Sequence, residues 1–209
     1  MHRRRFLALA SAAALLAACG RKPRLAALPA GSVVLAFGDS VTHGTGAAAG
    51  EDWPARLSAL TGWNVVNAGI PGDTAANGRE RIGGLLDEHR PALVIVEIGG
   101  NDFLKRRPQA AVKEDLRAIL AAVRGAGAQA VLVAVPELSL LGAVTRKPSD
   151  APIYAELAKE ERVPVIADVF ADVLGDAGLR ADPIHPNAEG YRRMADGLAG
   201  GLRETGLLR

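Results

Sequence analysis

The sequence predicts an α/β fold in which helices cover both faces of a parallel sheet of about five strands, a three-layer α/β/α sandwich. Three observations support this class. Short β-branched apolar runs alternate along the chain with longer segments whose apolar residues recur at helical spacing. The run Leu93–Ile98 is almost continuously apolar, which is typical of a parallel strand covered on both faces. With 209 residues, 49% of them hydrophobic, the chain suits one domain with an ordinary core, and disorder is excluded.

The first half of the predicted domain holds three strands and two helices. The strands are the apolar runs Val33–Phe37, Val65–Asn67 and Leu93–Ile98. A short helix at Trp53–Leu60 joins the first two strands. A second helix, roughly Thr74–His89, has apolar residues at helical spacing and a proline just beyond its end, where a helix commonly stops.

The second half continues the alternation of strands and helices. A helix at Val112–Val123 gathers its apolar residues on one face, and strands follow at Ala130–Val135 and Val163–Ala167. A helix that includes Tyr154–Lys159 separates these two strands, and Ala188–Leu202 is the final helix. In a sheet of this kind, catalytic and binding groups gather at the carboxyl ends of the strands.

The first thirty residues are predicted to lie outside the folded domain. Three arginines precede Phe6–Ala18, an uncharged stretch of thirteen residues that is too short to span a bilayer, so residues 1–18 have the pattern of a signal peptide. The sequence Leu-Ala-Ala before Cys19 resembles the lipobox of bacterial lipoproteins, in which the cysteine is lipidated and becomes the first mature residue. Residues 19–30 would then form the lipidated Cys and a tether, and residues 31–209 the domain.

The location expected from this leader is the bacterial cell envelope. Lipid chains on Cys19 would anchor the protein in a membrane, with the domain facing the periplasm. The arginines before Phe6 also resemble the twin-arginine export pattern. The alternative is an ordinary secretory signal cleaved near Ala18, which would leave a free thiol.

The distribution of charge argues against a nucleic-acid partner. The net charge is +2 and the pI is near 8.9, but six of the 25 basic residues lie in the first thirty residues, which hold no acid. The rest of the chain therefore carries more acidic than basic side chains, and we expect no nucleic acid to bind. The single cysteine also excludes an internal disulfide and any zinc site that needs two cysteines.

Polar residues follow the first three predicted strands and include a candidate nucleophile. Ser40 lies in a Gly-rich turn after the first strand, and Asp182 and His185 come late in the chain. A histidine can remove the hydroxyl proton of a serine while a carboxylate orients the histidine ring. Gly72, which has no side chain in the way, and Asn101, through its amide, could donate hydrogen bonds to a developing oxyanion. Both follow strands that we expect beside the strand of Ser40.

Together these residues resemble the four blocks of the SGNH, or GDSL, hydrolase family. The blocks are Gly38-Asp39-Ser40, Gly72, Gly100-Asn101 and Asp182-x-x-His185, and Val41 stands where the family name has Leu. The similarity covers nearly all of residues 32–202 and is strongest to the bacterial multifunctional thioesterase, protease and lysophospholipase branch with its arylesterase relatives. The resemblance implies a flavodoxin-like sheet, Ser40 as nucleophile, His185 as base, Asp182 as its orienting carboxylate, and an oxyanion hole from the N–H groups of Ser40 and Gly72 and the side chain of Asn101.

The activity that the resemblance implies is that of a serine esterase, which cleaves carboxylic esters or thioesters through an acyl-serine and uses no cofactor or metal. Its partner would be a small ester or lipid, and we expect a monomer. Activity is expected to fall at mildly acid pH, where His185 takes a proton. Phe103, Leu104 and Leu138–Val144 could line an acyl groove or be ordinary packing. Lys105–Arg107 could attract a phosphate-bearing substrate or be a solvated run of charge.

Other functional classes fit the sequence less well. The α/β-hydrolase elbow Gly-x-Ser-x-Gly is absent, because Thr42 stands at its last position. A dinucleotide site would need a tighter glycine turn than the one at Gly44, and an acid where the second strand ends in Asn67. A metal-dependent phosphoesterase could use the same polar residues as ligands, but only His185 is a histidine placed for it. A non-enzymatic envelope lipoprotein would have no need of a His–Asp pair beside a serine.

Overall fold

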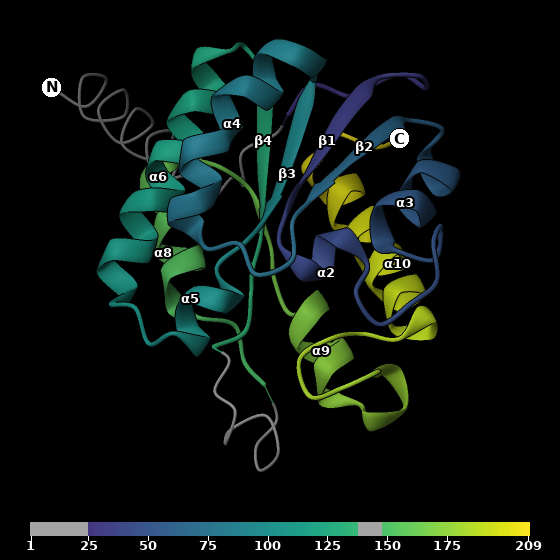
Figure 1. Ribbon diagram of the computed structural model, residues 1–209. Helices are drawn as coiled ribbons and strands as arrows, with labels where there is room; N and C mark the ends of the chain where they lie inside the picture. Colours follow the sequence, from purple (N-terminus) through teal and green to yellow (C-terminus); the bar gives the residue numbers. More distant parts are fainter. Residues whose placement is uncertain (1–24, 138–147) are drawn as a thin grey trace, which may run out of the picture.

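The computed structural model describes residues 25–137 and 148–209, which form a five-stranded parallel sheet between two layers of helices (Figure 1). The strands are β1 (Val33–Gly38), β2 (Asn64–Gly69), β3 (Leu93–Glu97), β4 (Gln129–Val133) and β5 (Val165–Ile166). Their order in the sheet is β2-β1-β3-β4-β5, as in flavodoxin-like sheets. The predicted α/β/α sandwich is confirmed. The predicted signal peptide and Cys19 lie outside the described residues.

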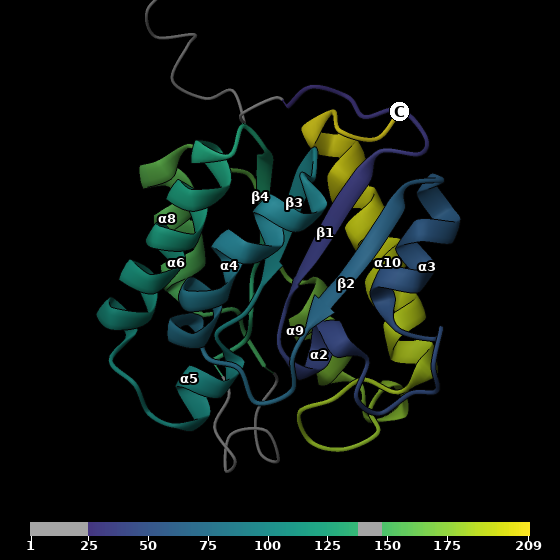
Figure 2. The same ribbon diagram turned by 45° about the horizontal axis from the view of Figure 1, so that its top comes forward.

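Two groups of helices cover the two faces of the sheet (Figure 1 and Figure 2). One face carries α4 (Ala75–His89), α6 (Gln109–Gly125) and α8 (Pro152–Glu161). The other carries α3 (Trp53–Thr61), α10 (Ala188–Thr205) and, packed on α10, α9 (Val169–Gly175). Short helices α2 (Ser40–His43) and α5 (Gly100–Leu104) lie at the carboxyl end of the sheet, and a single 3-10 turn, η1 (Ala177–Leu179), precedes α10. Among the described residues, no helix is both long enough and apolar enough to cross a bilayer.

Strand β1 lies between β2 and β3, and this order brings three strand ends together. Gly38 pairs in register with Gly69 on β2 and with Glu97 on β3, so the three following turns begin at the same edge. Strand β1 is buried from its second residue onward, because helices cover both faces of the sheet. The expectation that the strands before the two oxyanion candidates flank the strand of the nucleophile is confirmed.

The observed elements differ from the predicted ones mainly at their ends. The fifth strand keeps only Val165–Ile166 of the predicted Val163–Ala167, because the N–H of Val163 is bonded to the Ala158 carbonyl and Pro164 has no N–H. The sequence analysis does not predict α9, although its buried residues recur at helical spacing. Helices α2 and α5 are too short to give a periodic signal.

The last part of the predicted tether belongs to the folded domain. The N–H of Leu25 donates to the Thr205 carbonyl at 3.1 Å, and the N–H of Leu28 donates to the Leu207 carbonyl at 3.0 Å. The side chain of Gln129 exchanges two further hydrogen bonds with this segment. The two leucine side chains also pack on the core, and burial of their apolar surface stabilises the contact. The predicted domain boundary after residue 30 therefore comes too late.

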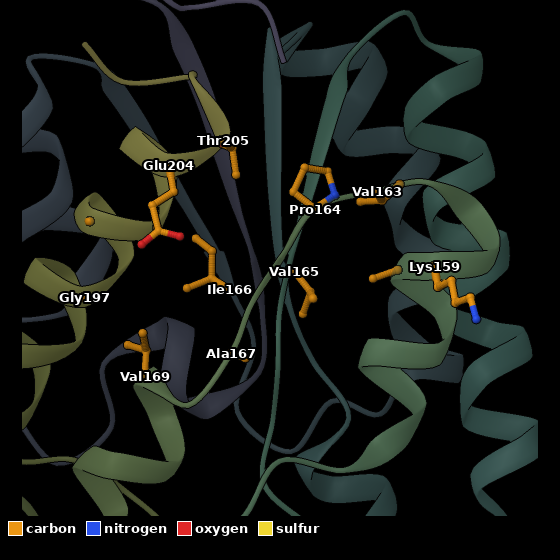
Figure 3. Close-up of a pocket in the computed structure, with 13 residues that line it drawn as sticks. Lys159, Val163, Pro164, Val165, Ile166, Ala167, Val169, Gly197, Glu204 and Thr205 are labelled. Carbon is orange, nitrogen blue, oxygen red and sulfur yellow. The ribbon is translucent and has the colours of Figure 1, made fainter. Parts of the chain in front are cut away.

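A groove of about 540 Å³ runs along the outer edge of β5, between α8 and α10 (Figure 3). Its lining is mainly apolar and includes Val165, Ile166 and Val169, with Lys159 and Glu204 at its sides. None of the residues predicted for the candidate site lines this groove. The candidate site lies instead at the carboxyl ends of β1, β2 and β3.

Candidate active site

Ser40 begins α2, directly beyond the end of β1. The side chain of Asp39 caps this short helix, because its Oδ1 accepts a hydrogen bond from the N–H of Val41 at 3.0 Å. Gly38 leaves no room for a side chain, since an added Cβ would lie 2.1 Å from Oγ1 of Thr42. Because Gly38 has no side chain, the backbone can pass close to α2 and turn sharply. This turn places Ser40 at the edge of the sheet.

Ser40, His185 and Asp182 form a continuous chain of hydrogen bonds. Ser40 Oγ lies 2.9 Å from His185 Nε2, and His185 Nδ1 lies 2.7 Å from Asp182 Oδ2. Asp182 Oδ1 accepts from the backbone N–H groups of Ile184 and His185, both at 2.9 Å. Burial alone would raise the pKa of Asp182, but the hydrogen bonds from His185 and Ile184 hold it below its ordinary value. An ionised Asp182 can therefore hold the imidazole with Nε2 toward the hydroxyl.

The loop that carries His185 is fastened on both sides. Within it, the N–H of Ala181 donates to the His185 carbonyl at 2.9 Å. Beyond it, Asn187 caps α10 by accepting from the N–H of Gly190 at 3.0 Å, and its amide donates to the Gly178 carbonyl at 2.9 Å. Because α10 packs on α3 and α9, these bonds tie the histidine loop to the body of the domain.

Gly72 supplies a backbone N–H in the turn after β2. The N–H of Asp73 bonds to the Ile70 carbonyl at 3.2 Å, with Pro71 second and Gly72 third in the turn, at a φ of +85°. These are the features of a type II turn, whose third position needs glycine. An added Cβ would meet nothing within 4 Å, so conformation and not space selects the glycine. Within residues 25–137 and 148–209, the N–H of Gly72 makes no hydrogen bond.

The amide of Asn101 joins the turns around Ser40. Its Nδ2 donates to the Asp73 carbonyl at 2.9 Å and to Asp39 Oδ2 at 3.2 Å. Asp73 follows Gly72 and Asp39 precedes Ser40. The Asn101 amide therefore connects the turn after β2 to the turn after β1. The structure thus brings Asn101 next to the turn of the candidate nucleophile and bonds it to the residue that follows Gly72.

A shallow pocket opens at this point of the sheet edge. Ser40, Asn101 and His185 contribute to its lining. The apolar part of the lining comes from three separate segments, through Leu104, Phe170 and Ile184. An acyl or alcohol group next to Ser40 would therefore meet apolar side chains on one side and hydrogen-bond donors on the other.

Two buried carboxyl groups, those of Asp39 and Glu97, lie close to Ser40 in the fold. Burial raises the pKa of Asp39 to about 6, although the N–H of Val41 and the charge of His185 act against this. Glu97 is fully buried, and burial together with the charge of Asp39 raises its pKa well above the ordinary value. Its Oε2 accepts from the Thr42 hydroxyl at 2.7 Å, whereas Oε1 has no partner in the part of the chain that the structure describes. Burial therefore favours the protonated form of Glu97.

Replacing Glu97 by Gln is expected to make the stability of the protein less dependent on pH. Below about pH 4.3, the ordinary pKa of a glutamate, Glu97 is protonated in both the folded and the unfolded state. Above that pH only the unfolded state loses the proton, so the stability of the wild type falls as pH rises, by up to about 1.4 kcal/mol per pH unit, until the raised pKa is reached. The Tm of Glu97→Gln relative to that of the wild type should therefore increase as the pH rises above about 5.

Thermal melts at several pH values measure this difference. The matched control is Glu80→Gln, which makes the same change at an exposed position on α4. A difference between Glu97→Gln and the wild type that stays constant over this range would show that Glu97 is ionised in the folded protein.

Two charged residues whose side chains lie at the strand ends, Glu97 and Arg81, were not predicted from the sequence. A signal for Glu97 was present, because an acid inside the apolar run Leu93–Ile98 has to be buried if the strand is covered on both faces. Arg81 lies on α4 and reaches the ends of β1 and β2. No local pattern distinguishes it from the other arginines of the chain.

The apolar residues predicted as possible lining of an acyl groove differ in where they lie. Phe103 is buried and packs edge to face on Tyr154, with 6.5 Å between the ring centroids, so it belongs to the core. Leu104 lines the pocket at Ser40, as an acyl-contacting residue would. The stretch Leu138–Val144 lies outside the described residues.

The three basic residues after α5 also separate into different environments. Lys105 is exposed, and its Nζ lies 3.4 Å from the Gly72 carbonyl. Arg106 is exposed as well. Arg107 is held by the carboxylates of Asp102 and Asp115, so it supports the loop internally.

The polar groups of the site pair with one another in the folded protein. Asn101 donates to Asp39, and Asp182 pairs with His185. In residues 25–137 and 148–209, no group of three or more His, Cys, Asp or Glu side chains has the arrangement of a metal site.

Known proteins resemble this chain in both sequence and fold. The model of the GDSL-like lipase/acylhydrolase family matches residues 36–193. The chain is 36% identical over 177 residues to Thioesterase 1/protease 1/lysophospholipase L1 of Escherichia coli (strain K12), covering 81% of this chain and 83% of that protein. It is 30% identical over 182 residues to an arylesterase of Vibrio mimicus, covering 83% and 90%. The crystal structure of TesA superposes with a TM-score of 0.72 at 28% identity, covering 83% of this chain and 99% of that one.

Proposed function

This chain belongs to the GDSL-like lipase/acylhydrolase family, and we propose that this carboxylic ester hydrolase works through an acyl-enzyme on Ser40. The observation that carries the proposal is the chain of hydrogen bonds from Ser40 through His185 to Asp182. In the turn after β2, the N–H of Gly72 has no hydrogen-bond partner among the described residues. A protein that only binds a ligand would have no use for a base poised on a serine hydroxyl.

In the first step, Ser40 Oγ attacks the carbonyl carbon of an ester or thioester. The hydroxyl proton passes to His185 Nε2, and the Asp182 carboxylate stabilises the resulting imidazolium through Nδ1. The tetrahedral intermediate then collapses and expels the alcohol or thiol, which takes the proton from Nε2. In the second step, water gives a proton to His185 Nε2 and attacks the acyl carbon. The second tetrahedral intermediate then collapses, the bond from the acyl carbon to Ser40 Oγ breaks, and Oγ takes the proton from Nε2 as the acid is released.

The N–H groups of Ser40 and Gly72 and the amide of Asn101 would stabilise the oxyanion in both steps. Asn101 Nδ2 makes its longer hydrogen bond, at 3.2 Å, to Asp39. The hydrogen in this longer bond is the one that the amide can share with an oxyanion, because three-centre bonds of this kind are common in proteins. Asp39 then has two roles, to cap α2 and to orient the amide toward the reacting carbon.

A panel of substrates tests this function. It contains p-nitrophenyl esters of increasing chain length, phenyl acetate, lysophosphatidylcholine and acyl-CoA. We expect oxygen esters to be hydrolysed and the activity to survive EDTA. Loss of activity with EDTA and its return with manganese would favour a metal-dependent phosphoesterase instead. A protein that neither hydrolyses the panel nor reacts with a fluorophosphonate probe would be a non-enzymatic envelope lipoprotein.

We further propose that the protein is exported and held in the bacterial cell envelope by lipid on Cys19, with the domain facing the periplasm. The chain enters the domain at Leu25, which is bonded to Thr205 at the last turn of α10. His185 lies just before the first turn of α10, and the 18 residues of this helix span about 27 Å. The chain therefore enters at the end of the domain opposite the active site (Figure 1). This arrangement would point Ser40 away from the anchoring membrane.

Cys19→Ala is expected to abolish lipid incorporation and release the protein from the membrane fraction. The thiol is the acyl acceptor in this proposal, and Cys19 is the only cysteine of the chain. Labelled palmitate should enter the wild type and not the variant. We expect kcat on a water-soluble ester to stay the same, because the described chain begins at Leu25, at the end of the domain opposite Ser40. Equal labelling of both proteins would contradict the lipid anchor.

A further inference from the structure

We propose that Arg81 is a positioning residue, which holds the oxyanion donors in register with Ser40 although it touches neither the substrate nor the residues that react. The inference rests on the proposed roles of Gly72 and Asn101. Arg81 lies on α4, and its side chain is only 19% exposed. Its guanidinium reaches three separate segments at the carboxyl end of the sheet.

Each nitrogen of the guanidinium has an acceptor on a different segment. Nη2 donates to the Gly38 carbonyl at the end of β1 at 2.8 Å, and Nη1 donates to the Ala68 carbonyl on β2 at 2.9 Å. Nε donates to Asp73 Oδ2 at 2.7 Å, and this carboxylate is itself only 14% exposed. The planar group also stacks over Phe37, with its central carbon 4.2 Å from the ring centroid. These contacts leave the guanidinium little freedom to move.

Two of the three acceptors are close in sequence to proposed catalytic groups. Gly38 precedes Ser40 by two residues on the same turn, and Asp73 directly follows Gly72. The carbonyl of Asp73 also accepts the hydrogen bond from Asn101. The Arg81 guanidinium therefore connects the turn of the nucleophile to the turn after β2. That second turn carries the N–H of Gly72, and its Asp73 carbonyl orients the amide of Asn101. A shift of this second turn by about 1 Å would cost up to about 100-fold in rate, because the donors must meet the oxyanion at hydrogen-bond distance.

A purely structural Arg81 leads to a different expectation. In that case, its loss would lower the Tm and leave the kinetics of the folded protein unchanged. A positioning role lowers kcat and weakens the binding of a transition-state analogue, while KM for the substrate stays nearly constant. The two roles can therefore be separated by measurements on folded protein well below the Tm.

The test compares Arg81→Lys with a matched control, Arg79→Lys, which makes the same change two residues away on α4. The Arg79 side chain is 53% exposed and pairs with Asp115. Lysine keeps the charge but cannot supply three donors in a plane, so Arg81→Lys should lower kcat on a p-nitrophenyl ester by about 10- to 100-fold. The inhibition constant of a trifluoromethyl ketone should rise by the same factor, with KM within about twofold of the wild type. Arg79→Lys should match the wild type in all three measurements.

Two more variants keep the test decisive if Arg81→Lys folds poorly. Asp73→Asn leaves the donors to Gly38 and Ala68 in place and should lower kcat by a smaller factor, again without a change in KM. Arg81→Ala should regain part of its kcat when guanidinium is added at low millimolar concentration, whereas ammonium should have no effect.

A kcat within about threefold of the wild type in both Arg81→Lys and Asp73→Asn would overturn the proposal, as would an effect confined to KM or to the Tm. Failure of the proposed function would be seen elsewhere, as activity that survives the loss of Ser40. An inactive Ser40→Ala together with a fully active Arg81→Lys would reject this inference alone.

Discussion

Ser40→Ala is expected to lower kcat on every hydrolysed ester by at least about 10⁴-fold while the protein stays folded. The variant removes the oxygen that forms the acyl bond and leaves water as the only attacking group. Ser40 Oγ bonds to His185 and takes no part in the packing of the core, so the Tm should move by only a few degrees. Steady-state kinetics on the ester panel and a thermal melt measure the two effects.

The matched control for this variant is Ser32→Ala. The hydroxyl of Ser32 donates to the Pro29 carbonyl, outside the site, so this variant should keep the wild-type kcat. A fluorophosphonate probe should label the wild type and Ser32→Ala and leave Ser40→Ala unlabelled. A Ser40→Ala protein that keeps about a tenth of the wild-type kcat would contradict the acyl-enzyme mechanism.

His185→Ala should lower kcat by a factor similar to that of Ser40→Ala. Without the imidazole, no base among the described residues lies within hydrogen-bond distance of the hydroxyl to take its proton and return it to the leaving group. The double variant Ser40→Ala/His185→Ala should be no slower than the slower single variant, because residues that act as one unit have non-additive effects. The three rate constants, measured on the same p-nitrophenyl ester, give the comparison.

His43→Ala serves as the control for a missing imidazole. His43 is an exposed residue at the end of α2, three positions after Ser40, so it tests whether any nearby histidine can act as the base. We expect it to behave as the wild type. If His185→Ala retained more than about a tenth of the wild-type kcat, another group would have to be the base.

Much of the fold could be predicted from local patterns. The strand Leu93–Ile98 was found from its apolar run, and α4 and α6 from residues repeated at helical spacing, because burial on one or two faces leaves a regular trace in the sequence. The exact ends of β5 were not found from such a pattern. They depend on the N–H of Val163 being taken by α8 and on the missing N–H of Pro164.

The residues of the candidate site could be listed from the sequence, but their connections could not. Resemblance and chemistry singled out Ser40, Asn101 and His185, and the structure places them in one pocket. The two bonds of the Asn101 amide and the three bonds of the Arg81 guanidinium follow from the packing of turns that lie far apart in the chain. A contact between side chains that are distant in the chain produces no periodic pattern in the sequence.

The sequence by itself determined the class of the fold, the order of its elements and the kinds of side chain available for catalysis. These properties follow from local hydrophobic periodicity and from short motifs at strand ends. Only the tertiary structure decided how the loops beyond the strands pack, which brings Ser40 Oγ within 2.9 Å of a histidine 145 residues later in the chain. It also decided that the segment from Leu25 packs on the end of α10, away from the site. The physical reason is that the packing of loops and side chains is set by burial summed over the whole domain, whereas a sequence pattern records only the environment of its own segment.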